Sequence, residues 1–272
     1  MPVEKSPDGR RSVHAEAIVP GTPEQVWQAI ATGPGISSWF VPSEVEEREG
    51  GTTVSHFGAG NSMDAVAKIT EWSPPHRFAA ESNDDPSLGP VATEWIVEAR
   101  DGGTCTVRVV HSWFASTDDW DGQFEGHTYG WIGFFKILRL YLARFAGQPC
   151  TLLQLNAIAP EPAASAWASL VEPLGLTGVQ DGQSVRAPAG APPLGGVVEE
   201  AGPPEFPSLL IRLADPAPGI AHLFAMPMGG TIYLSIRLFL YGDDASAAAA
   251  QAEPIWQAWL AERFPAGEPA AS

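Results

Sequence analysis

The stretch VATEWIVEARDGGTCTVRVVHSWF, residues 91–114, holds two strongly patterned segments around a glycine-rich turn. Apolar and polar residues alternate on both sides of Asp101, Gly102 and Gly103, as expected for two half-buried strands. A glycine-rich turn between two such segments is typical of an antiparallel hairpin. The stretch therefore predicts a hairpin that turns one face toward a core.

Alternation assigns the side chains of this hairpin to faces. In the second strand, we expect the inward face to carry Cys105, Val107, Val109, His111 and Trp113. In the first strand, Trp95 and Val97 are expected to point the same way. The inward face is therefore predicted to be apolar and aromatic, with one histidine.

A long helix is predicted after the hairpin. From Phe124 onward, apolar residues recur every three or four positions, which is the period of one helical face. This face includes Trp131, Phe135 and Leu138, and His127 lies one turn before Trp131. We expect it to pack against the sheet.

Upstream of the hairpin, the segment HAEAIV, residues 14–19, alternates and predicts a strand. A helix is expected next, because Thr22 is a good N-cap, Pro23 suits the first helical position and Gln25 completes a capping box. A short second helix should end near the Trp39–Phe40 pair. Four further strand candidates follow, at residues 43–49, 52–57, 64–72 and 77–82.

The two halves of the chain repeat in order. Four segments of the first half, residues 22–30, 65–78, 102–110 and 141–149, resemble residues 161–170, 195–206, 229–238 and 259–269 of the second. A chain of 272 residues also exceeds one typical domain of about 100 to 150 residues. We therefore predict a duplication, with domains at residues 11–147 and 150–266.

Several motifs of the first half resemble the SRPBCC (START-like) superfamily, and within it the family related to the activator of the heat-shock protein 90 ATPase. They are TPEQVWQAI, the WF pair, EWSPPHRF, the hairpin VATEWIVEARDGGTCTVRVVHSWF and GWIGFFKILRLYL. The resemblance implies an α+β fold of two tandem helix-grip domains. Each is a curved antiparallel sheet wrapped around a long C-terminal helix, with a cavity between them.

The second half is expected to be a degenerate copy. It lacks the WF pair, its middle reads PAGAPPLGG, and Pro254 interrupts the pattern of its closing helix. The residues expected to point toward that helix are Leu210, Phe224, Tyr233 and Phe239.

Composition restricts the class of partner and the location. The net charge of −17 repels phosphate backbones, so we expect no nucleic-acid partner and no anionic membrane surface. No run approaches the roughly 18 apolar residues of a membrane span, and the N-terminus has no secretory signal pattern. We expect a cytoplasmic protein. The protein partner, if any, is not indicated.

The predicted site lies between the sheet and the long helix of the first domain. Its candidate ligand-binding residues are Trp39, Phe40, Trp95, Val97, Val109, His111, Trp113, His127, Trp131, Phe135 and Leu138. An aromatic pocket with a few polar groups is the usual form of a small-molecule site, but the rings can equally fill the space themselves. His111 and His127 are candidate polar groups, and their alternative is an ordinary hydrogen-bonded role in the core.

Three functions remain open. The leading hypothesis is binding of a small apolar ligand without catalysis. The second is an enzyme of the polyketide cyclase or aromatase type, in which His111, His127 or Tyr129 serves as acid or base. The third, suggested by the resemblance alone, is a co-chaperone-like interaction protein. We predict no cofactor and no metal, because the two histidines match no ligand spacing and Cys105 and Cys150 form no CxxC motif.

Overall fold

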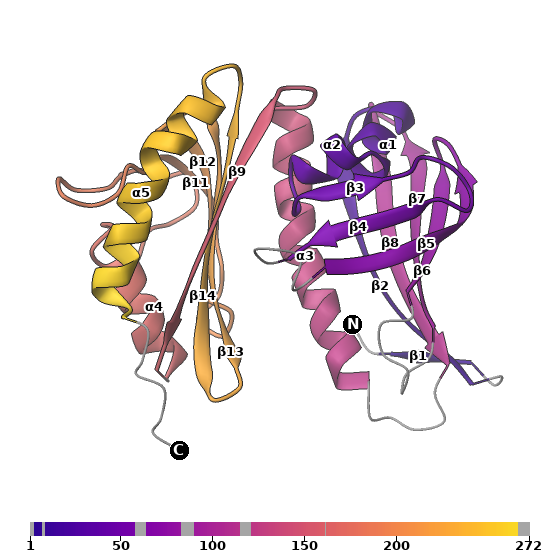
Figure 1. Ribbon diagram of the computed structural model, residues 1–272, viewed down its shortest axis with the longest axis horizontal. Helices are drawn as coiled ribbons and strands as arrows, with labels where there is room; N and C mark the ends of the chain where they lie inside the picture. The colour runs from indigo at the N-terminus through magenta and orange to yellow at the C-terminus, as the bar shows by residue number, and fades with distance from the viewer. Residues whose placement is uncertain are drawn as a thin grey trace. The chain divides into compact units, whose positions relative to one another are not determined.

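The computed structural model describes residues 3–6, 9–57, 64–82, 90–114, 121–160 and 162–265, without the side chains of residues 114 and 121–129. The chain divides into two compact units, Met1–Gly147 and Gln148–Ser272, here called domain 1 and domain 2 (Figure 1). Each unit combines an antiparallel sheet with a long C-terminal helix. The predicted α+β class with two tandem helix-grip domains is confirmed.

Domain 1 begins with strands and two short helices. These are β1 (Glu4–Lys5), β2 (Arg10–Pro20), α1 (Pro23–Ala31) and α2 (Gly33–Ser37). The remaining elements are β3 (Ser43–Val45), β4 (Thr52–His56), β5 (Asp64–Ser73), β6 (Arg77–Ser82), β7 (Val91–Arg100), β8 (Thr104–Phe114) and α3 (Asp121–Arg144). All strands predicted in the first half are present, and β1 is an addition that the sequence pattern did not indicate.

The eight strands of domain 1 form one sheet in the order β1-β2-β8-β7-β6-β5-β4-β3. The predicted hairpin of residues 91–114 is β7 and β8, inside the order, and Thr104 pairs with Arg100 next to the turn. Four of the five expected inward residues of β8 are buried, with Cys105, Val107 and Val109 fully inaccessible, and His111 is half-buried. The hairpin therefore supplies the centre of the curved face.

The start of α1 follows the predicted capping box. The amide of Gln25 donates to Thr22 Oγ1 at 3.4 Å, and the Gln25 side chain accepts from the amide of Thr22 at 2.9 Å. These two bonds satisfy amides that have no partner within the helix. The cap fixes where α1 begins, and so places Val26, Trp27 and Ile30 in the core.

Replacing Thr22 by alanine removes one of these bonds and is expected to lower the free energy of unfolding by about 1 kcal/mol. Thr22→Ser keeps the hydroxyl and is the matched control. Urea unfolding of the two variants measures the difference. An alanine variant as stable as the serine variant would contradict the role of the cap.

Among the described residues, domain 2 repeats the plan with six strands instead of eight, one fewer at each edge of the sheet. Its elements are β9 (Cys150–Ala159), α4 (Ala163–Val171), β10 (Ser184–Arg186), β11 (Gly195–Ala201), β12 (Ser208–Asp215), β13 (Gly219–Met228), β14 (Thr231–Tyr241) and α5 (Ala245–Arg263). The sheet order is β10-β11-β12-β13-β14-β9, so the first strand pairs with the last, as β2 pairs with β8. The four repeated segments fall on equivalent elements, which supports the duplication.

The core of domain 2 corrects one prediction. Trp256, Trp259 and Leu260 of α5 share a buried cluster with residues that include Leu209 and Ile211 of β12. Because neighbours along a strand point to opposite faces, the residues expected to face α5 lie on the other face of the sheet: Leu210, Phe224, Tyr233 and Phe239. The prediction was wrong because it followed the aromatic rings of Tyr233 and Phe239, which share their face of β14 with Ser235 and Arg237. The uniformly apolar face of β14 is the one in the cluster with α5: Ile232, Leu234, Ile236, Leu238 and Leu240.

The closing helix of domain 2 also differs from expectation. Pro254 was predicted to interrupt the pattern, but α5 runs from Ala245 through Pro254 to Arg263. The helix is 19 residues long, and the indoles after the proline pack in the core. Across the part of the chain that the structure describes, no helix is both long and apolar enough to cross a membrane.

Candidate ligand-binding site

Two cross-strand rows build the sheet side of the site. In the first, Phe78 of β6 pairs with Trp95 of β7, which pairs with Val109 of β8. In the second, Thr93 pairs with His111. Directly opposed residues share a face of the sheet, so both rows point inward. The site therefore has an aromatic row beside a polar one.

The WF pair reaches the site from the end of α2. The amides of Trp39 and Phe40 both donate to the carbonyl of Ile36, at 3.1 and 2.9 Å, which turns the chain immediately after the helix. Trp39 is 1% exposed, and its Nε1 donates to the carbonyl of Ala29 at 2.8 Å. This bond ties the loop to α1 and fixes the position of both rings.

Helix α3 closes the site with Trp131, whose ring lies among the others. It stacks on Phe40 with centroids 5.1 Å apart, and meets Trp95 edge to face at 5.1 Å. Trp39 in turn meets Trp95 at 6.3 Å, and Phe135 meets it at 6.1 Å. Rings from three separate segments thus form one aromatic layer between the sheet and α3.

The polar part of the site is a chain of two hydrogen bonds. Trp131 Nε1 donates to His111 Nε2 at 2.6 Å, and His111 Nδ1 lies 2.9 Å from Thr93 Oγ1. An indole nitrogen can only donate, so Nε2 must accept, and the imidazole proton is therefore on Nδ1, facing the threonine hydroxyl. His111 is held as the neutral imidazole, with both ring nitrogens engaged. Trp131 and His111 are half-buried, at the edge of the aromatic layer.

Not all predicted residues lie in this layer. Val97, Val109 and Leu138 are buried apolar residues. Trp113 belongs to a separate small cluster with Val13. His127 lies in α3, but its side chain is outside the described residues. The structure therefore brings together six of the predicted residues through ring contacts and hydrogen bonds: Trp39, Phe40, Trp95, His111, Trp131 and Phe135.

Three participants were missing from the prediction. Phe78 stacks on Trp95 at 6.3 Å, Phe134 meets Phe40 at 4.3 Å, and Thr93 holds His111. Phe78 and Thr93 could have been found from the hairpin registers, because both stand directly opposite a residue that was assigned. Phe134 lies on the helical face already assigned to the core.

The buried thiol beside the hairpin turn is not a nucleophile. Cys105 is fully buried, and its Sγ donates to the carbonyl of Gly21 at 3.3 Å. Burial, and secondarily the charge of Glu24, raise the pKa of the Cys105 thiol. Since the thiolate is the reactive form, this residue is inert at neutral pH. Among the described residues, no group of three His, Cys, Asp or Glu side chains is placed to hold a metal ion.

Residues 10–146 match the family model described as polyketide cyclase / dehydrase and lipid transport. The chain belongs to this family. This family match confirms the resemblance to the SRPBCC superfamily that the sequence motifs indicated. A comparison with curated proteins finds no match.

Three solved structures illustrate what this family member is similar to. The Aha1 dimer from Colwellia psychrerythraea is 22% identical, with a TM-score of 0.41, over 50% of this chain and 98% of that chain. The di-domain ARO/CYC BexL from the BE-7585A biosynthetic pathway is 13% identical, with a TM-score of 0.46, over 95% and 100% of the two chains. DynU16, from the dynemicin biosynthetic locus, is 16% identical, with a TM-score of 0.41, over 93% and 97%.

Proposed function

We propose that domain 1 binds a small, largely apolar molecule at the aromatic layer between its sheet and α3, without catalysing a reaction. The observation that carries this proposal is the Thr93–His111–Trp131 chain at the half-buried edge of that layer. Sites for small molecules combine apolar walls with a few fixed polar groups. The walls would supply most of the affinity, and the polar chain would orient one end of the ligand.

The state of His111 favours binding over catalysis. A general base needs an accessible lone pair near the proton that it removes. The lone pair of His111 Nε2 accepts from Trp131 at 2.6 Å, and Nδ1 carries the proton toward Thr93. The thiol of Cys105 is protonated and buried. For either group to act on a substrate, its present partner would first have to leave.

An enzyme of the cyclase or aromatase type is the second candidate. The family description favours it, because that description includes polyketide cyclases and dehydrases as well as lipid transport. In this reading Trp131 swings away from His111 and the released Nε2 accepts a proton from the substrate. A co-chaperone role rests on the sequence resemblance alone. The net charge of −17 supports a small-molecule partner over a nucleic acid.

The test is a titration of the full chain with apolar acids, phenols and polycyclic compounds, followed by tryptophan fluorescence and by native mass spectrometry of the retained complex. We expect binding by at least one class. His111→Ala should weaken it about tenfold with folding preserved, because Trp131 and Thr93 lose the hydrogen bonds that hold them in place at the edge of the layer. His14→Ala is the matched control, because His14 lies on β2 opposite Val110, on the other face of the same sheet.

Two outcomes would overturn the proposal. If no compound quenches the fluorescence or is retained, the layer is a packed core and not a site. If a bound polyketide is converted to a cyclised product, the protein is an enzyme and the second candidate replaces the first.

A further inference from the structure

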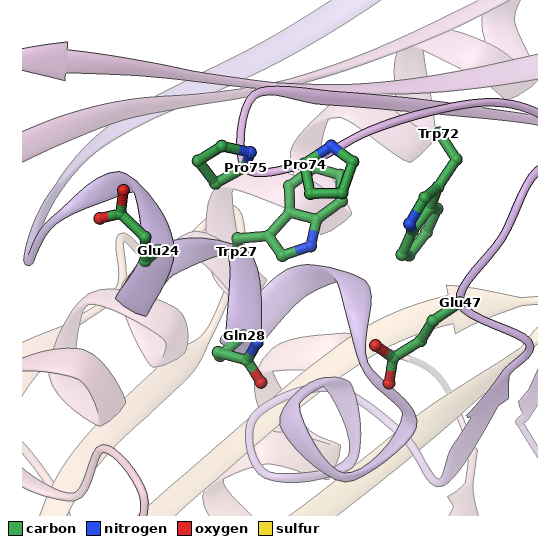
Figure 2. A pocket seen from close by; sticks show the side chains of 7 residues that line it. All are labelled: Glu24, Trp27, Gln28, Glu47, Trp72, Pro74 and Pro75. Atoms are coloured by element: carbon green, nitrogen blue, oxygen red, sulfur yellow. The ribbon is translucent and has the colours of Figure 1, made fainter.

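A hollow lies in domain 1 beside α1, and its lining residues are distinct from those of the aromatic layer. It has a volume of about 360 Å³, and we call it the α1 pocket. Its walls come from three segments: Glu24 and Trp27 of α1, Glu47 after β3, and Trp72, Pro74 and Pro75 around the β5–β6 turn (Figure 2). A volume of this size is within the range of sites for small molecules, about 300 to 1,000 Å³.

The two indoles of the α1 pocket are fixed in place by packing. Trp27 is 4% exposed and meets Trp72 edge to face, with centroids 5.1 Å apart. Phe78 supports both rings, at 5.8 Å from Trp27 and 5.5 Å from Trp72. Trp72 itself is half-buried, so part of its indole remains accessible. A ligand would meet a preformed aromatic wall, which lowers the entropic cost of binding.

Negative charge surrounds this wall. Figure 2 shows the carboxylates of Glu24 and Glu47 at opposite ends of the pocket, with Trp27 between them. Gln28 is the other polar side chain at the pocket, and the described residues that line it include no lysine or arginine. Bonds donated by the backbone amide of Glu24 and by the Thr22 hydroxyl lower the pKa of the Glu24 carboxyl, with a smaller effect of His76. Glu24 is therefore ionised at neutral pH.

We propose that the α1 pocket binds a small organic cation, with its ammonium group against the indole surface and between the two carboxylates. The face of an indole attracts a cation through the ring quadrupole, and tryptophan does so more strongly than the other aromatic residues. Carboxylates at both ends add a long-range attraction for the same charge. An apolar ligand without charge would use the rings but not Glu24 and Glu47, so charge is the property that the pocket selects.

The test compares choline with 3,3-dimethylbutan-1-ol, which has the same shape without the charge. Calorimetric titration of the full chain at one pH and one salt concentration measures both affinities. We expect choline to bind roughly 3- to 30-fold more tightly than the alcohol. Its affinity should also fall as salt is added, because salt screens the exposed carboxylates.

Matched variants locate the site. Glu47→Gln should weaken choline binding roughly two- to fivefold, while Glu98→Gln, on an exposed position of β7, should leave it unchanged. Trp72→Phe keeps a ring against Phe78 and should weaken binding, since phenyl is the poorer partner for a cation. Trp131→Phe, in the aromatic layer, should have no effect.

Equal affinities for choline and the alcohol would overturn the proposal, as would the absence of choline binding. Loss of binding in Trp131→Phe, with Glu47→Gln unaffected, would place the cation in the other site and would also overturn it. These outcomes are independent of whether the aromatic layer takes up an apolar ligand.

Discussion

Replacing Trp39 by alanine is expected to lower the free energy of unfolding of domain 1 by about 3 to 5 kcal/mol. The indole is 1% exposed, touches Phe40 and Trp95, and donates a hydrogen bond to the carbonyl of Ala29. Alanine would remove this packing and leave a cavity where three elements meet. The loss should therefore reach the upper range of single substitutions in a core.

One further variant separates the loss of the hydrogen bond from the loss of packing, and a second serves as an exposed control. Trp39→Phe keeps much of the ring volume and loses the bond to Ala29, so we expect a smaller loss, of about 1 to 2 kcal/mol. Phe206→Ala removes an aromatic ring that is 58% exposed in domain 2, and should change stability by no more than about 0.5 kcal/mol. Urea unfolding, with amide exchange of β7 and β8 reporting domain 1, measures all three. A loss below about 1 kcal/mol in Trp39→Ala would show that the ring does not hold the layer together.

Local sequence signals were sufficient to predict most of the helices and strands of domain 1. The capping box at Thr22 predicted the first residue of α1, and the alternation in β8 placed Cys105, Val109 and His111 on the buried face. These predictions were correct because each rests on a local period or motif. Such local patterns do not depend on how distant elements pack together. Glycine, proline and aspartate residues likewise marked the boundaries between the six strands predicted from residue 43 to residue 114.

The contacts between residues of the candidate site cannot be predicted from the periodicity of single helices and strands alone. The sequence placed His111 and Trp131 in the same space, but their hydrogen bond depends on the rotation and depth of α3. The partner on the other side, Thr93, follows from the β7–β8 register and could have been predicted. A pattern along one element gives the face that a residue occupies, while the partner across the core depends on how two elements pack.

The α1 pocket could not be predicted from the periodicity of single elements. Trp27 is buried in the core, yet one part of its ring lines a hollow. The other walls, Glu47 and the Trp72–Pro75 turn, come from segments that share no periodicity with α1. Only the folded chain places them together.

Replacing Pro254 by alanine is expected to raise the free energy of unfolding of domain 2 by about 2 kcal/mol. Proline inside a helix lacks the amide that would donate to the carbonyl four residues earlier, and its ring clashes with that carbonyl, at a cost of about 3 kcal/mol relative to alanine. The Pro254 side chain is exposed, so no packing is lost with it. The gain is reduced by about 0.4 to 1 kcal/mol, because alanine leaves the unfolded chain more freedom.

Whether Pro254→Ala raises or lowers the free energy of unfolding also tests how α5 packs against its sheet. Trp256 and Trp259 follow the proline within two turns and are both buried in the core of domain 2. If a bend at Pro254 is needed to seat these indoles, straightening the helix would displace them and the alanine variant would be less stable than the parent. Gln251→Ala, an exposed change in the turn before, is the control and should stay within about 0.5 kcal/mol. Urea unfolding with amide exchange of α5 and β14 reports on domain 2, and a gain in Pro254→Ala alone would show that the proline is tolerated in this helix and not required by it.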